Sequence, residues 1–268
     1  EYGKVRVIRQ QDLMLLDIIA TTNWRRPVYF AMTIPTESLI GLKEYLQLEG
    51  LAFRLTPKKA ANPWSNVNEE RVRQQLFNDV EAGSKTPAPG YRWRGLQDST
   101  TYFDEEIRHL MVNCRQAFIL LARHYIDSPG MAAKVSETLD HMEQVLPQTV
   151  IEMDLRTRMY VAGLYNSAGN KSKAQLISGS LVRELKSEIA QGVAGPLSGD
   201  NPYVLLLQTY ETMEQFDDAL RIVDLLHARF AREKDIELIV GQTRAALLAE
   251  QTKARQRDSL ASATPVKR

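Results

Sequence analysis

Two windows in the second half of the chain repeat the same spacing of key residues. In the first window, Tyr165 is followed nine residues later by Ala174, and in the second, Tyr210 is followed nine residues later by Ala219. A leucine comes sixteen residues after each tyrosine. A small alanine lets two helices approach closely, and large residues fill the groove between them. The spacing therefore predicts stacked helical hairpins.

This pattern is typical of tetratricopeptide repeats. A weaker copy begins at Tyr125, where Gly130 and Ala133 are displaced by a residue. The copies start 40 and 45 residues apart, rather than about 34 as in the regular repeat, so we expect irregular hairpins. The prediction is a mainly α fold in which tetratricopeptide-like α-α superhelical hairpins occupy residues 101–253. A final helix at 236–253 would cap the stack.

The first hundred residues have a different character and predict a small α/β unit. Pro27 ends the first helical pattern, because proline disfavours the α region for the residue before it. Gly50 is a plausible C-terminal cap for a second helix. The expected order is a helix at 10–22, a strand at 28–32, a helix at 39–48 and a strand at 51–55. This order allows a parallel strand pair joined by a right-handed crossover.

Composition and charge narrow the class of protein. Of 268 residues, 44% are hydrophobic and 25% are charged, which is typical of a soluble globular chain. No apolar run approaches the roughly 20 residues needed to span a bilayer. The net charge of +1 gives no field that would select nucleic acid as a partner. The basic tail at 254–268 predicts disorder, and the lack of an initial methionine suggests a piece of a larger protein.

Several segments of the front half resemble one family. They are Leu16-Asp17-Ile18-Ile19-Ala20, Asn23-Trp24-Arg25-Arg26-Pro27-Val28-Tyr29-Phe30-Ala31, Glu49-Gly50-Leu51-Ala52-Phe53-Arg54-Leu55-Thr56-Pro57, Trp93-Arg94-Gly95-Leu96 and Tyr102-Phe103-Asp104-Glu105. Together they resemble the soluble C-terminal domain, of unknown function, of bacterial multi-pass membrane proteins. Those proteins are related to the protein O-mannosyltransferases of the GT-C glycosyltransferase superfamily. The resemblance covers about residues 10–175.

The resemblance implies that the parent is a membrane glycosyltransferase or a close relative. The catalytic carboxylate of such enzymes lies between early transmembrane helices, outside this chain, and the present domain would lie in the periplasm. Its implied role is non-catalytic docking of a protein or glycan acceptor, of a partner, or of its own transmembrane region. Two alternatives stay open: a helical-repeat interaction scaffold with no link to glycosyl transfer, and a carbohydrate-binding module whose platforms are Trp24, Tyr91 and Trp93.

A first group of candidate contact residues follows the first predicted helix. Asn23, Trp24, Arg25 and Arg26 could form a polar corner that binds a phosphate or a sugar, because guanidinium forks suit phosphate oxygens. The favoured interpretation is structural. In it, Asn23 ends the helix, Trp24 fills the junction between helix and strand, and the two arginines pair with nearby carboxylates.

A second group lies further along the chain. Arg54 interrupts an otherwise apolar strand, so a buried ion pair with Glu49 or Asp17 is the favoured interpretation. Aromatic and basic residues then alternate from Tyr91 through Arg92 and Trp93 to Arg94. This alternation suits sugar stacking or single-stranded nucleic acid. A short edge strand or extended segment, with one apolar face inward and one basic face in solvent, is the favoured interpretation.

No metal, cofactor or catalytic site is predicted. Glu105 and His109 stand one helical turn apart, but they are two ligands where a catalytic zinc needs three. Cys114 is the single cysteine and fits a buried, inert thiol. The chain has neither a phosphate-binding glycine loop nor a nucleophile elbow.

Overall fold

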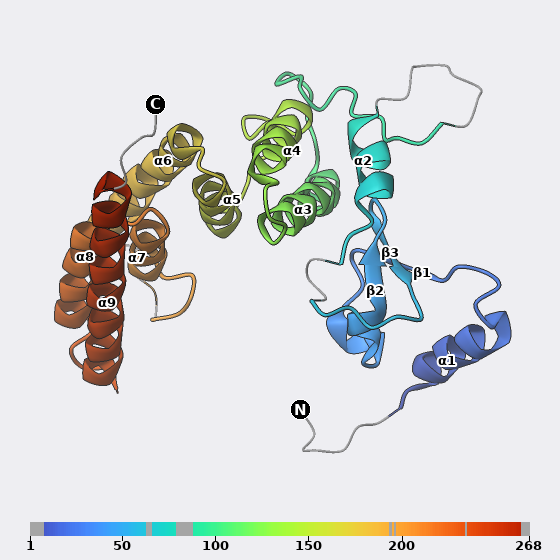
Figure 1. The fold of residues 1–268 in the computed structure, drawn as a ribbon, viewed down its shortest axis with the longest axis horizontal. Helices are drawn as coiled ribbons and strands as arrows, with labels where there is room; N and C mark the ends of the chain where they lie inside the picture. The colour runs from blue at the N-terminus through green and yellow to red at the C-terminus, as the bar shows by residue number, and fades with distance from the viewer. Residues whose placement is uncertain are drawn as a thin grey trace. The chain divides into compact units, whose positions relative to one another are not determined.

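The computed structural model of the chain describes residues 8–62, 66–78, 88–192, 195, 197–233 and 235–263. The fold is mainly helical with a small three-stranded sheet near the N-terminus, which confirms the predicted fold class (Figure 1). The chain divides into two compact units, residues 1–152 and residues 153–268.

The sheet of the first unit is antiparallel throughout. Its strands are β1 (Tyr29–Ala31), β2 (Leu46–Leu48) and β3 (Ala52–Leu55), in the order β1-β3-β2. Phe30 pairs with Phe53, and Leu46 pairs with Leu55. A three-residue turn joins β2 to β3, so these two strands form a hairpin.

The predicted helix at 39–48 and the predicted parallel strand pair are therefore wrong. Two short 3₁₀ helices, Thr36–Leu39 and Leu42–Tyr45, precede β2 instead. Between them, Ile40 and Gly41 adopt the left-handed conformation, with φ of 42° and 86°. Two consecutive left-handed residues cannot continue an α-helix. The alternation of Leu46, Gln47 and Leu48 then suits a half-buried strand.

Helix α1 spans Gln10–Thr22, as predicted, and ends at Asn23, which has a φ of 43°. Leu15 and Ile19 pack against a cluster of buried side chains on the sheet and the adjoining 3₁₀ helix. That cluster comprises Phe30, Leu39, Leu46 and Leu55. One side of α1 is thus fixed to the sheet.

Three further helices complete the first unit: α2 (Glu69–Phe77), α3 (Glu105–Ile126) and α4 (Ala132–Val145). Glu69 links them, since it accepts hydrogen bonds from Lys134 Nζ at 2.6 Å and Tyr125 Oη at 3.0 Å. Arg73 pairs with Glu137 at 2.7 Å. These contacts hold α3 and α4 against α2. The compact unit 1–152 therefore includes α3 and α4 as well as the sheet and α2.

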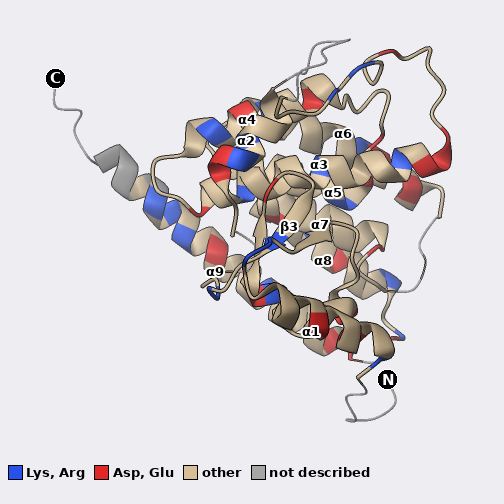
Figure 2. Ribbon diagram, turned by 90° about the vertical axis from the view of Figure 1, so that its right-hand side faces the viewer, with Lys and Arg blue, Asp and Glu red and all other residues tan. Residues whose placement is uncertain are grey.

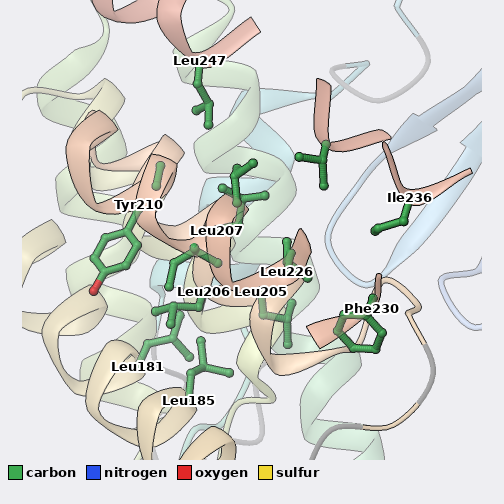
Figure 3. Close-up of a cluster of buried hydrophobic side chains, with 14 residues drawn as sticks. Leu181, Leu185, Leu205, Leu206, Leu207, Tyr210, Leu226, Phe230, Ile236 and Leu247 are labelled. Carbon is green, nitrogen blue, oxygen red and sulfur yellow. The ribbon is translucent and has the colours of Figure 1, made fainter. Parts of the chain in front are cut away.

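The second unit contains α5 (Leu155–Ser167), α6 (Lys171–Ala190), α7 (Pro202–Thr212), α8 (Phe216–Arg229) and α9 (Ile236–Ala263). Consecutive helices contact one another along this series. Apolar side chains from α6, α7, α8 and α9 gather into one buried cluster (Figure 3). Its largest members include Leu181, Leu185, Leu205, Leu206, Tyr210, Leu226 and Phe230.

The repeated tyrosines and alanines occupy matching places in two hairpins. Ala174 and Ala219 are each 0% exposed, and Tyr165 and Tyr210 are buried. In the weaker copy, Ala133 is exposed. The expected close approach at that alanine is therefore wrong.

The C-terminal tail is more ordered than predicted. Helix α9 continues to Ala263, so residues 254–263 are helical, and residues 264–268 lie outside the described residues. Among the described helices, none combines the length and the hydrophobicity that a membrane crossing requires.

Candidate functional site

A buried carboxylate organises one end of the sheet. The Glu49 side chain is 4% exposed and lies in the turn between β2 and β3. Its Oε2 accepts hydrogen bonds from Tyr29 Oη at 2.7 Å and Arg71 Nη1 at 3.4 Å. Its Oε1 accepts from Asn68 Nδ2 at 3.2 Å and Arg54 Nη1 at 3.5 Å. Four donors thus satisfy the carboxylate.

Local structure explains why these donors converge. Tyr29 on β1 and Arg54 on β3 are direct partners in the antiparallel register, so their side chains share one face of the sheet. Asn68 is the N-cap of α2 and accepts a hydrogen bond from the Arg71 amide at 3.3 Å. The start of α2 and the sheet therefore meet at Glu49.

The hydrogen bond to Glu49 and partial burial both raise the pKa of the Tyr29 hydroxyl, the hydrogen bond being the larger effect. The hydroxyl therefore stays protonated at neutral pH and remains a donor. A buried carboxylate requires compensating positive charge. The guanidinium groups of Arg54 and Arg71 supply it for Glu49.

Tyr91 closes a second side of this region. Its hydroxyl oxygen accepts a hydrogen bond from the Leu51 amide at 2.8 Å, and burial raises its pKa. Gly50 has a φ of 77°, and a Cβ added there would lie 2.6 Å from the Tyr91 hydroxyl oxygen. Glycine is thus required in the turn for conformation and for space. Trp93 packs edge-on against Tyr91 and donates from Nε1 to the Leu76 carbonyl at 3.0 Å.

These side chains border a cavity of about 650 Å³, which we call the Glu49 pocket. Helix α2 contributes one polar face to it, from residues spaced one turn apart. The lining residues are Tyr29, Glu49, Asn68, Glu70, Arg71, Gln74, Gln75, Pro89 and Tyr91.

The predicted contact residues fall in different places. Arg54 pairs with Glu49, one of its two predicted partners. Tyr91 lines the Glu49 pocket, whereas Trp93 is buried behind it and Arg94 is exposed. The segment Tyr91–Arg94 contains no strand, because its backbone pairs with no neighbouring strand. The segment is therefore not an edge strand, but Trp93 faces inward while Arg92 and Arg94 are exposed, as predicted.

The polar corner after α1 lies apart from the pocket lining. Asn23 ends α1, which confirms its structural role. Trp24 is 52% exposed, so the expectation that it fills the junction between helix and strand is wrong. Its φ of 60° turns the chain here, and the cluster on the sheet is filled by Leu15 and Ile19 instead. Arg25 and Arg26 are exposed.

Sequence reasoning missed the contribution of α2. Val72 and Leu76 are buried on one side of this helix, while Glu70, Arg71 and Gln74 lie on its polar side. Such a polar face is ordinarily solvated, and no local signal in the sequence links it to Tyr29 or to Tyr91. Only the tertiary fold brings them together.

A second feature is the apolar surface of α1. Four large side chains of this helix are exposed: Leu13 (57%), Met14 (60%), Leu16 (44%) and Ile18 (49%). Together with Trp24 they form what we call the α1 surface. Most of α1 carries no charge in Figure 2. The side chains packed on the sheet, Leu15 and Ile19, are apolar too.

The two side chains weighed as metal ligands, and rejected as too few, are exposed at the start of α3. Glu105 and His109 both face solvent. Over the described ranges, no group of three or more histidine, cysteine or acidic side chains gathers as a metal site requires.

One comparison with known proteins gives a match. Residues 1–76 match the family model described as TMEM260-associated domain 2. This segment includes α1, the whole sheet and nearly all of α2. The match agrees with the resemblance to the soluble domain of O-mannosyltransferase-related membrane proteins. No curated protein and no solved structure matches the chain.

Proposed function

We propose that this chain is a non-catalytic docking domain of a TMEM260-like membrane protein, and that the α1 surface docks on the transmembrane region of that protein. The observation that carries this proposal is the exposure of the four large apolar side chains of α1. A group of exposed large apolar side chains ordinarily marks an interaction site, and here the exposed Asp17 stands among them on the same helix. The match to TMEM260-associated domain 2 covers α1 completely and supports the same role.

The dimensions of α1 suit lying against a partner rather than crossing a bilayer. Its 13 residues extend for about 20 Å at 1.5 Å per residue, whereas the hydrocarbon core is about 30 Å thick. Covering Leu13, Met14, Leu16 and Ile18 would contribute on the order of 1 kcal/mol for each half-exposed side chain. Exposed Trp24 adds an aromatic anchor at one end.

In this role the domain holds a protein or glycan acceptor close to a transferase centre in the membrane region. The domain would lie on the periplasmic side, as the resemblance implies. Glycosyl transfer itself would be carried out by residues outside this chain.

Photo-crosslinking in the full-length parent tests the proposal. A photoreactive benzoylphenylalanine replaces Leu13 or Ile18, and the protein is irradiated in its native membrane. We expect crosslinks to the transmembrane region of the same protein. The control position is Leu176, an exposed leucine of α6 in the second unit, which should not crosslink to that region. Crosslinks from position 13 only to lipid, or to nothing, would overturn the proposal.

A second candidate function is a protein-interaction scaffold formed by the second unit. A mostly apolar cavity of about 400 Å³ lies among α7, α8 and α9 and suits an apolar segment of a partner. It is lined in part by Leu207, Leu226, Ile239 and Val240. A photoreactive group at exposed Ile239 should capture a separate polypeptide under this function. If the group at position 239 captures no separate polypeptide, while groups at positions 13 and 18 crosslink to the transmembrane region, docking through α1 is favoured.

A further inference from the structure

We propose that the Glu49 pocket binds a neutral polyhydroxylated ligand, namely a single sugar unit of a glycan. The site does not depend on the docking proposed for α1. It also differs from the aromatic platform considered above, because Trp93 is buried and Trp24 lies outside the pocket lining.

The size of the pocket fits a small ligand. Its volume of about 650 Å³ lies within the range of about 300–1,000 Å³ found for small-molecule sites. The pocket is bordered by the sheet, by the first two turns of α2 and by Tyr91, so its walls come from three separate segments. A ligand in it would touch all three.

The lining offers donors and acceptors side by side. Gln75 supplies two N–H donors and a carbonyl acceptor. Gln74 donates one N–H to Glu70 Oε1 at 3.5 Å, which leaves its second N–H, its carbonyl and the other Glu70 oxygen for a ligand. The Tyr91 oxygen accepts from the Leu51 amide, which leaves its own hydrogen to donate. A sugar hydroxyl both donates and accepts, so this mixture matches a row of hydroxyl groups.

Charge argues against an ionic ligand. The lining carries the carboxylates of Glu49 and Glu70 and the guanidinium group of Arg71. Arg54 lies outside the lining and pairs with Glu49, so that the four charged groups together balance. A phosphate site needs an excess of positive charge, and an ammonium site needs an excess of negative charge. Since Arg54 and Arg71 neutralise the buried Glu49 and leave Glu70 at the edge, the pocket favours a neutral polar ligand.

The polar groups are also held in place before a ligand arrives. Glu49 fixes Tyr29, Asn68 and Arg71 through hydrogen bonds of 2.7, 3.2 and 3.4 Å. The Arg71 side chain is nevertheless 55% exposed, so its remaining N–H groups can reach a ligand. Such preorganisation lowers the entropic cost of binding. Tyr29 and Tyr91 add aromatic rings, whose negative faces suit the C–H groups of a pyranose.

The test is an NMR titration of the purified chain with simple sugars. The neutral probes are N-acetylglucosamine and the methyl glycosides of mannose, glucose and galactose. The charged comparators are glucuronate and glucose 6-phosphate. We expect at least one neutral sugar to give saturable shifts of the Gln74 and Gln75 side-chain amides. No shift with any neutral sugar, or stronger binding of a charged comparator at the pocket, would contradict the proposal.

Variants assign the binding to the pocket. The double substitution of Gln74→Ala and Gln75→Ala should weaken the affinity at least tenfold, and Glu70→Gln, which preserves size, should weaken it about threefold. The matched control is Gln175→Ala, at an exposed glutamine of α6 that should leave binding unchanged. Equal affinity in the wild type and the folded Glu70→Gln and double variants would overturn the site. A negative titration leaves the crosslinking result at α1 untouched, so the two proposals fail separately.

Discussion

Glu49 shows how one buried charge sets the stability of a small sheet. Glu49→Gln would leave Arg54 and Arg71 without their carboxylate. Because both guanidinium groups are about half exposed, we expect a loss of about 1–3 kcal/mol rather than the larger cost of a fully buried pair. Urea unfolding followed by circular dichroism measures it. The control is Glu44→Gln, whose partner Lys59 is exposed, and which should cost under about 1 kcal/mol.

Glu69 gives the first unit a dependence on pH. The hydrogen bond from Lys134 lowers the pKa of Glu69 most, and the one from Tyr125 adds to it. A lowered folded pKa means that this stabilisation is present above the unfolded value of about 4.3 and is lost as pH falls through the folded value. The difference in unfolding free energy between wild type and Glu69→Gln should therefore shrink from pH 7 to pH 3. A difference that stays constant over this range would contradict the assignment.

The turns of the two hairpins use the same left-handed position. Gly169 and Glu214 each stand four residues after the repeated tyrosine, with φ of 80° and 56°. A Cβ at Gly169 would meet no atom within 4 Å, so Gly169→Ala tests conformation alone. We expect it to destabilise the protein by about 1–2 kcal/mol, measured by thermal unfolding.

The matched control for that substitution is Gly179→Ala. Gly179 lies inside α6 with open space around it, and its φ is not left-handed. Alanine should stabilise the helix there by about 0.8–1 kcal/mol, because it forms helices better than glycine. Two Gly→Ala changes should thus have opposite signs. If both substitutions destabilise the protein, conformational strain does not explain the loss of stability caused by Gly169→Ala.

At the scale of elements, the second unit depends on a close approach of α5 and α7. A Cβ added to Gly163 of α5 would lie 2.9 Å from Thr212 Cγ2 of α7. Gly163→Leu should therefore destabilise the second unit by about 1–3 kcal/mol through overpacking. Gly179→Leu, at a helical glycine with open space, should be neutral or stabilising in the same unfolding experiment. Equal effects at both positions would argue against close packing of these helices.

Element boundaries were predictable where the signal was local. The apolar spacing in 10–22 and the proline that follows were enough to place α1. The prediction of a helix at 39–48 was wrong because the leucines of this segment are equally compatible with a helix and with a short strand. The left-handed conformation of Ile40 and Gly41 interrupts the helix. Isoleucine rarely adopts that conformation, so the sequence does not predict the interruption.

At the scale of the molecule, a destabilising substitution in one compact unit should not destabilise the other unit. Hydrogen exchange followed by mass spectrometry tests this. Glu49→Gln should raise exchange within residues 8–152 only, and Gly163→Leu within residues 153–263 only, since substitutions without shared partners act independently. Raised exchange in both units from either variant would show that they unfold together.

The helical class and the hairpins marked by Tyr165 and Tyr210 could be read from the sequence alone, which also narrowed the partner of Arg54 to Glu49 or Asp17. These follow from periodicity within one element, or from the need of a buried charge for a partner close in sequence. The antiparallel sheet, the exposure of Trp24 and the exposure of α1 became known only from the folded chain. Each depends on which surfaces meet across long separations in the chain. The Glu49 pocket belongs with these, because its polar walls come from segments whose side chains, taken singly, are ordinary solvated positions.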